Sequence, residues 1–113
     1  MESQDRSLLQ KELQQIVRAT EKLDFPWMST LNDRQAILQA EKRNIEAQIE
    51  TRMTSHGLGA ALNDINFADY WEQADTAARK QFGDLSERQM LNGFYLQEVM
   101  HRYAELITNA ILL

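Results

Sequence analysis

The stretch "YLQEVMHRYAELITNAI", residues 95–111, has the clearest helical pattern in the chain. Its apolar residues recur at spacings of three and four, which places them on one half of a helical wheel. They are Tyr95, Leu96, Val99, Met100, Tyr103, Leu106, Ile107, Ala110 and Ile111. The polar half holds Gln97, Glu98, His101, Arg102, Glu105, Thr108 and Asn109. We therefore predict an amphipathic C-terminal core helix whose polar half faces water.

The rest of the chain also favours helices. Glycine (4 residues) and proline (1 residue) are scarce among 113 residues, and no alternating strand pattern occurs. We predict an all-α fold of about four helices, a helical hairpin or bundle, in a single domain covering 1–113. The C-terminal helix is expected to begin at Ser86, because "SERQ" has the form of a capping box.

Two polar helices are predicted ahead of the C-terminal half, over about 3–23 and 30–56. Each has a narrow apolar stripe, which is typical of a helix that packs on one neighbour. The first stripe is Leu9, Leu13, Ile16, Val17 and Leu23, and the second is Leu31, Leu38, Ile45, Ile49 and Met53. Lys42 falls within the second stripe, where its methylenes can cover apolar surface. "SHGLG", residues 55–59, ends the second helix, with Gly57 at the C′ position.

The segment between these two helices contains the only proline, Pro26. A proline disfavours helix at the residue before it, so the first helix should end near Asp24. Phe25 and Trp27 make the segment apolar, which favours an anchored corner and a hairpin of the two helices. The alternative is that 1–27 forms an arm that packs on another protomer. Met28 would open a shorter product, and the sequence does not show whether it is used as a start.

The third segment, 58–82, is expected to break at Asn63-Asp64 and to restart at Asn66, a good N-cap residue. Its aromatic residues include Tyr70 and Trp71, which are adjacent and therefore about 100° apart on a helix. One narrow stripe cannot bury both equally. We predict that one of them lies at an edge or in a partner interface, where both residue types are enriched.

The charge pattern of this region is one-sided. No Lys or Arg occurs between Met53 and Ala78, and this window contains Asp64, Asp69, Glu72 and Asp75. One interpretation is an acidic face that binds a basic partner or mimics a nucleic acid. The favoured interpretation is local: acidic residues suit the start of a helix, and Asp75 can pair with Arg79. The net charge of −5 argues against direct binding of nucleic acid.

A second candidate partner surface lies at the start of the C-terminal helix. Met90, Leu91 and Phe94 fall on the half that is polar further along, so the helix would expose apolar groups there. Phe94 would be the anchor of such an interface. The alternative is that residues 82–85 fold back and cover the three side chains.

Motifs for catalysis, cofactors or metals are weak. "EVMH" places Glu98 and His101 three residues apart, but a carboxylate-bridged metal bundle needs two such motifs and the chain has one. We expect no catalytic residue, no cofactor and no metal. The chain has no cysteine, and it shows no signal peptide and no apolar run long enough to span a membrane, so we expect no membrane association and a cytoplasmic protein.

The function expected from these patterns is binding. We predict a non-enzymatic protein-protein interaction module, a small helical regulator, inhibitor or adaptor that binds a partner protein and forms a homodimer. The small size, glutamine-rich helices and apolar C-terminal helix resemble helical subunits and chaperones of bacterial secretion systems, and also small phage-encoded inhibitors. This resemblance includes no motif and implies no site residue. Two alternatives to the binding module remain. One is a structural subunit or chaperone of a helical assembly such as a bacterial secretion system, and the other is an acidic mimic of nucleic acid that inhibits a DNA- or RNA-binding protein.

Overall fold

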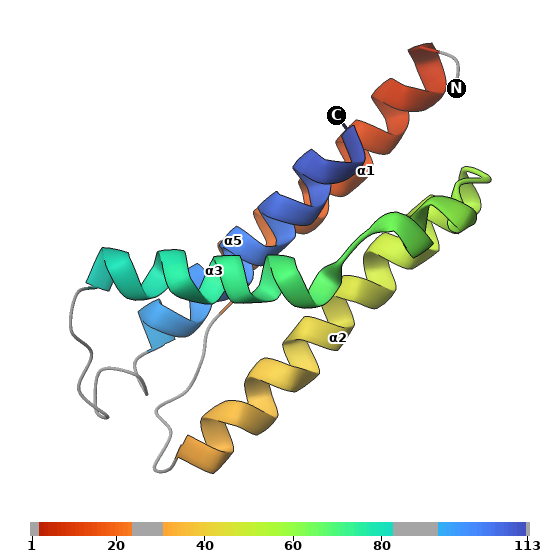
Figure 1. Ribbon diagram of the computed structural model, residues 1–113. Coiled ribbons are helices and arrows are strands. Elements are labelled where there is room, and N and C mark those ends of the chain that lie inside the picture. The colour runs from red at the N-terminus through yellow and green to blue at the C-terminus, as the bar shows by residue number, and fades with distance from the viewer. Residues whose placement is uncertain (1–2, 24–30, 83–92, 113) are drawn as a thin grey trace.

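The computed structural model of the protein describes residues 3–23, 31–82 and 93–112, and these residues form helices and short connections without a strand (Figure 1). The elements are α1 (Ser3–Thr20), α2 (Leu31–Ser55), the 3₁₀ helix η1 (Gly59–Asp64), α3 (Phe67–Phe82) and α5 (Gly93–Leu112). The predicted all-α bundle is confirmed. The expected start of the last helix at Ser86 and the corner at 24–29 lie outside the described residues.

Helix α5 occupies the centre of the arrangement. It packs against α3 and α1, and to a smaller extent against α2. Figure 1 shows α1 and α5 running antiparallel, so that both ends of the chain lie at one end of the molecule, while α3 crosses the bundle. The result is an elongated body of 48 × 22 × 22 Å. No helix in the described ranges has the length and apolar character needed to cross a bilayer.

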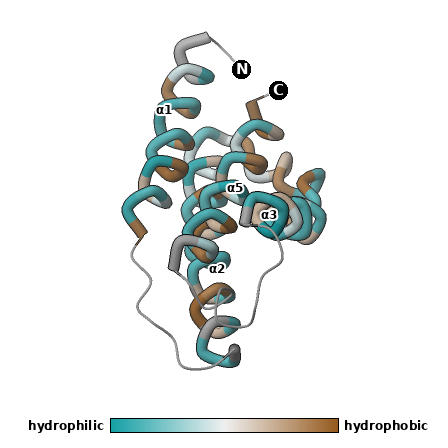
Figure 2. The backbone as a smooth tube through the Cα atoms, turned by 90° about the vertical axis from the view of Figure 1, so that its left-hand side faces the viewer, coloured by the Kyte–Doolittle hydropathy of each residue, from teal (hydrophilic) through white to brown (hydrophobic). Residues whose placement is uncertain are grey.

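The core is formed by one apolar face from each α-helix. In Figure 2 brown apolar residues recur among teal polar residues along the tube, clearly so on α1 and α5, as expected for amphipathic helices around a shared core. Helix α3 contributes Ala74 and Ala78, both fully buried and one turn apart, and such small side chains allow a close approach to α5. The other buried apolar residues are Leu9, Leu13, Ile16, Leu38, Ile45, Ile49, Met53, Tyr95, Leu96, Val99, Met100, Tyr103, Ala104 and Ile107.

The position of α1 differs from the simple hairpin that we expected. Its main neighbour is α5, and its contact with α2 is smaller. The side chain of Gln97 on α5 donates to the carbonyl groups of Glu21 (2.6 Å) and Leu23 (3.2 Å), just beyond the end of α1. The last carbonyls of α1 itself accept from Thr20 and from the N–H groups of residues 21–23, so Gln97 fastens the segment that follows α1 to α5.

Two predicted helix ends have the expected geometry. Gly57 has φ +74°, its N–H donates to the carbonyl of Thr54, and the N–H of Leu58 donates to the carbonyl of Met53. This is a Schellman motif with glycine at C′. At the start of α3, the N–H of Asp69 donates to Oδ1 of Asn66 at 3.0 Å, so the predicted N-cap is confirmed.

A substitution in α1 tests its contribution to the core. Leu13 is fully buried, so Leu13→Ala should lower the free energy of unfolding by about 3 kcal/mol, through lost burial and the cavity left behind. Gln15→Ala changes an exposed residue of the same helix and should cost less than about 0.5 kcal/mol. Urea unfolding of both variants measures the difference. Equal small losses would show that α1 adds nothing to the stability of the fold.

Candidate interaction surface

The apolar patch predicted at the start of the last helix is not tested by the structure. Met90 and Leu91 lie outside the described residues. Phe94 belongs to α5, but its side chain is also outside what the structure describes. This patch therefore stays a prediction from sequence.

Trp71 is half-buried where three helices meet. Its ring packs edge-on against Tyr103 of α5, with centroids 5.0 Å apart and planes at 87°. Lys42 of α2 places its Nζ 5.5 Å from the Trp71 centroid, a cation–π distance. The lysine inside the apolar stripe of α2 thus covers an aromatic ring. Through these contacts Trp71 joins α3 to both α5 and α2.

Tyr103 brings a hydroxyl group into the core beneath Trp71. The hydroxyl donates to the carboxylate of Glu46 on α2, and Lys42 Nζ lies 3.7 Å from the same carboxylate. Burial raises the pKa of Tyr103 above its usual range, and the hydrogen bond to Glu46 and the negative charge of Glu46 raise it further. The phenol therefore stays protonated in the folded protein at pH values where an exposed tyrosine ionises.

Tyr70 lies on a different side of α3 from Trp71, as their spacing on the helix requires. It is half-buried and lines a cleft of about 360 Å³. Seven of the nine lining residues are apolar. The lining consists of Leu9 from α1, Met53 from α2, Leu58, Ala61, Asp64 and Ile65 from η1 and its flanks, Tyr70 from α3, and Ala110 and Ile111 from α5.

The walls of this cleft follow from local geometry. The Schellman motif turns the chain sharply after α2 and brings Leu58 and Met53 to the same cleft. Ala61 and Ala110 have short side chains, so they leave space that longer residues would fill. An open apolar cleft with a few polar groups is suited to receiving an apolar side chain of a partner.

The charge within the lining of the cleft is negative. Asp64 is the one charged residue in its lining, and the sequence has no Lys or Arg between Met53 and Ala78. The C-terminal end of α5, whose helix dipole is negative, forms another side. Arg6 donates to the carbonyl of Leu112 there. The wall formed by η1 and α3 therefore favours a cation on an incoming partner.

The four residues of the predicted acidic face have different environments. Asp64, Asp69 and Glu72 are exposed. Asp75 is half-buried, forms an ion pair with Arg79 at 3.0 Å and accepts a hydrogen bond from the Tyr95 hydroxyl. The expected Asp75–Arg79 pair is confirmed. Asp75 thus satisfies a buried hydroxyl of the core, and three carboxylates remain as exposed surface charge.

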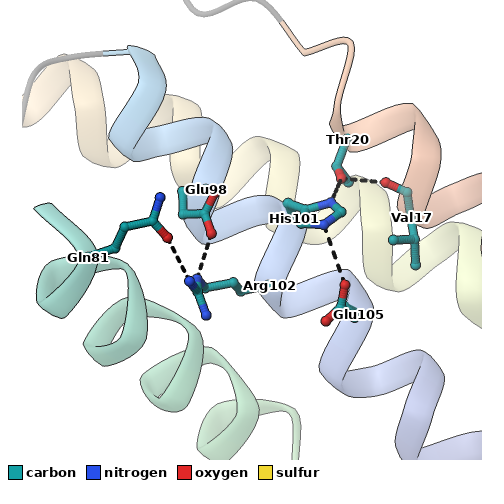
Figure 3. Close-up of polar contacts among 7 residues, drawn as sticks. All are labelled: Val17, Thr20, Gln81, Glu98, His101, Arg102 and Glu105. Atoms are coloured by element: carbon teal, nitrogen blue, oxygen red, sulfur yellow. Dashed lines mark hydrogen bonds and ion pairs between the residues drawn. The ribbon is translucent and has the colours of Figure 1, made fainter.

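The polar half of α5 is less exposed than predicted. Figure 3 shows His101 directed toward α1, where its Nδ1 lies 2.9 Å from the hydroxyl oxygen of Thr20. Because that hydroxyl donates to the carbonyl of Val17, its oxygen accepts from His101. On the other side of the ring, Nε2 lies 3.4 Å from Glu105. The prediction that His101 faces water was wrong, because α1 covers this flank of α5.

Helix α3 covers the opposite flank. Arg102 Nε lies 2.6 Å from Glu98, and Arg102 Nη2 donates to the side-chain oxygen of Gln81 on α3 at 2.6 Å (Figure 3). Thr108, also expected on the water-facing half, is only 3% exposed. The polar half of α5 thus forms contacts between helices along both edges. Within 3–23, 31–82 and 93–112, no three His, Cys, Asp or Glu side chains are grouped so as to hold a metal ion.

Comparison with known proteins adds no functional information. No protein-family model, no curated protein and no solved structure matches this chain.

From the contact between His101 and Thr20 we predict a loss of stability when the histidine is removed. His101→Ala removes a half-buried hydrogen bond between α5 and α1, so the free energy of unfolding should fall by about 1 kcal/mol. Asn109→Ala changes an exposed residue of the same helix and should cost less than about 0.5 kcal/mol. Chemical denaturation at neutral pH measures both. Equal values would mean that the contact adds no stability.

The raised pKa of Tyr103 predicts a loss of stability in alkali. Above about pH 10 the unfolded chain releases this proton while the folded protein keeps it, so stability falls by up to about 1.4 kcal/mol per pH unit for this group. Below that pH both states hold the proton and the loss is absent. Tyr103→Phe should therefore show a shallower decline between pH 10 and 11.5 than the wild type in urea unfolding. Parallel declines would contradict the assignment.

Proposed function

We propose that this chain is a non-enzymatic protein-interaction module, a small helical regulator, inhibitor or adaptor. The observation that supports the proposal most directly is the apolar cleft of about 360 Å³ beside Tyr70. It is open to the surface and is formed by residues from α1, α2, η1, α3 and α5. A partner would insert an apolar side chain there, in the way that interface anchors fill pockets on the opposite protein.

The chemistry of the lining supports binding in preference to catalysis. Asp64 and Tyr70 are its ionisable side chains, and the remaining lining is aliphatic. Such a lining supplies apolar contact area with two polar groups at its edge, a composition typical of binding sites. The absence of cysteine from the chain is in keeping with the cytoplasmic location that we also propose.

Mimicry of nucleic acid has less support. A phosphate mimic needs acidic groups repeated along a surface. Asp75 is engaged by Arg79 and Tyr95, which leaves Asp64, Asp69 and Glu72 as the exposed members of the acidic face. These charges suit one wall of a protein-binding cleft better than an extended backbone.

Two neighbouring alanines provide a matched test. Ala60 and Ala61 are both exposed and both belong to η1, but only Ala61 lines the cleft. Ala61→Trp should fill the cleft and reduce partner capture at least about tenfold, as loss of an interface anchor does, whereas Ala60→Trp should not. Tagged variants serve as bait in extract of the native host, with mass spectrometry of what is retained. Equal capture by Ala61→Trp and the wild type would exclude the cleft as the partner site.

A further inference from the structure

Leu8 is the exposed large apolar side chain of the described residues, with 51% of its surface accessible. One exposed leucine is ordinary on a protein surface. The position of Leu8 distinguishes it. It directly precedes Leu9, which lines the apolar cleft, and lies about 100° further around α1. An apolar projection therefore lies next to an apolar cleft on the same end of the molecule.

An exposed cation lies beside the projection, and an exposed carboxylate lies in the lining of the cleft. Lys11 is exposed and follows Leu8 by three residues, so the two side chains are neighbours on the surface of α1. Asp64 is the charged residue of the cleft lining, and the sequence from Met53 to Ala78 contains no Lys or Arg. His56 within that stretch lies 3.0 Å from Glu12 of α1, so these two groups are paired within the chain. Within one chain, the structure gives neither an ion pair between Lys11 and Asp64 nor a place for Leu8 in the cleft.

We propose that the cleft receives Leu8 from a second copy of this chain, with Lys11 of that copy facing Asp64. Because the projection and the cleft are adjacent, one two-fold rotation that places Leu8 of each protomer in the cleft of the other satisfies both contacts. Such an isologous arrangement is closed, so it produces a dimer and not a filament. The inference rests on the proposed function, since it uses the same cleft as the docking site.

Sedimentation velocity of the purified full chain is the first test. From about 1 to about 100 µM, a range in which interfaces of modest size associate, the wild type should form a discrete dimer. Leu8→Glu places a carboxylate against the cleft and should weaken dimerisation at least about tenfold. Gln10→Glu adds the same charge to an exposed position on another side of α1 and should leave the dimer intact. Thermal melting of each variant reports whether it is folded.

A charge exchange tests the pairing of Lys11 with Asp64. Lys11→Asp and Asp64→Lys should each weaken the dimer, and the two changes in one chain should restore most of the loss. Two single variants that weaken the dimer with no recovery in the double variant would overturn this pairing.

Disulfide trapping tests the same contact without introducing a charge. The chain has no cysteine, so Leu8→Cys and Ala61→Cys introduce single reactive groups. When the two variants are mixed under oxidising conditions, a disulfide should form between position 8 of one chain and position 61, in the cleft, of the other. A mixture of Gln10→Cys with Ala61→Cys should link much less. Equal yields in the two mixtures would contradict the docking of Leu8.

The outcomes of these experiments distinguish a failure of the proposed dimer from a failure of the proposed function. A wild type that is monomeric throughout, or a dimer that survives Leu8→Glu, overturns the dimer. If such a protein still loses its partner on Ala61→Trp, the proposed function stands without the dimer. If the dimer forms through Leu8 and no other protein is captured through the cleft, the dimer stands and the proposed function fails.

Discussion

The structure depends on the burial of two tyrosine hydroxyl groups on α5. Tyr95 and Tyr103 are both fully buried, and a buried hydroxyl without a partner would cost on the order of 1–3 kcal/mol. Asp75 of α3 accepts from Tyr95, and Glu46 of α2 accepts from Tyr103. Interlocked apolar side chains already restrict how a helix can slide or rotate, and hydrogen bonds add directional restraints. Two hydrogen bonds to two different helices fix the rotation of α5 and its position along its axis.

The position of α5 then decides which surfaces remain open. Since α1 and α3 both pack on it, the polar half of α5 is bordered on one side by Thr20 and on the other by Gln81. At the opposite end of α3, the chain has just left η1, and the last turn of α5 meets the Schellman turn after α2. Short side chains at Ala61 and Ala110 leave this meeting point unfilled. The cleft is thus a result of how the helices are joined.

Local features of the sequence predicted local features of the structure. The apolar half of α5, the glycine cap at Gly57 and the N-cap at Asn66 each depend on residues within a few positions of one another. The contact between Thr20 and His101 joins residues 81 positions apart, and a helical wheel has no information about a second helix. The narrow stripe of α1 likewise fits α5 as well as α2. The cleft takes one or two residues from each of several elements, so no motif marks it.

Adjacent residues on one helix face different surroundings because successive side chains are about 100° apart. Trp71 faces Tyr103 and Lys42 inside the bundle, while Tyr70 faces the cleft. On α1, Leu9 is fully buried and Leu8 is exposed. On α1 the turn of about 100° between neighbours places one leucine in the core and the other at the surface. On α3 the same turn directs two half-buried aromatic rings to different neighbours. A helix in a small bundle can therefore contribute to the core and to the surface within a single dipeptide.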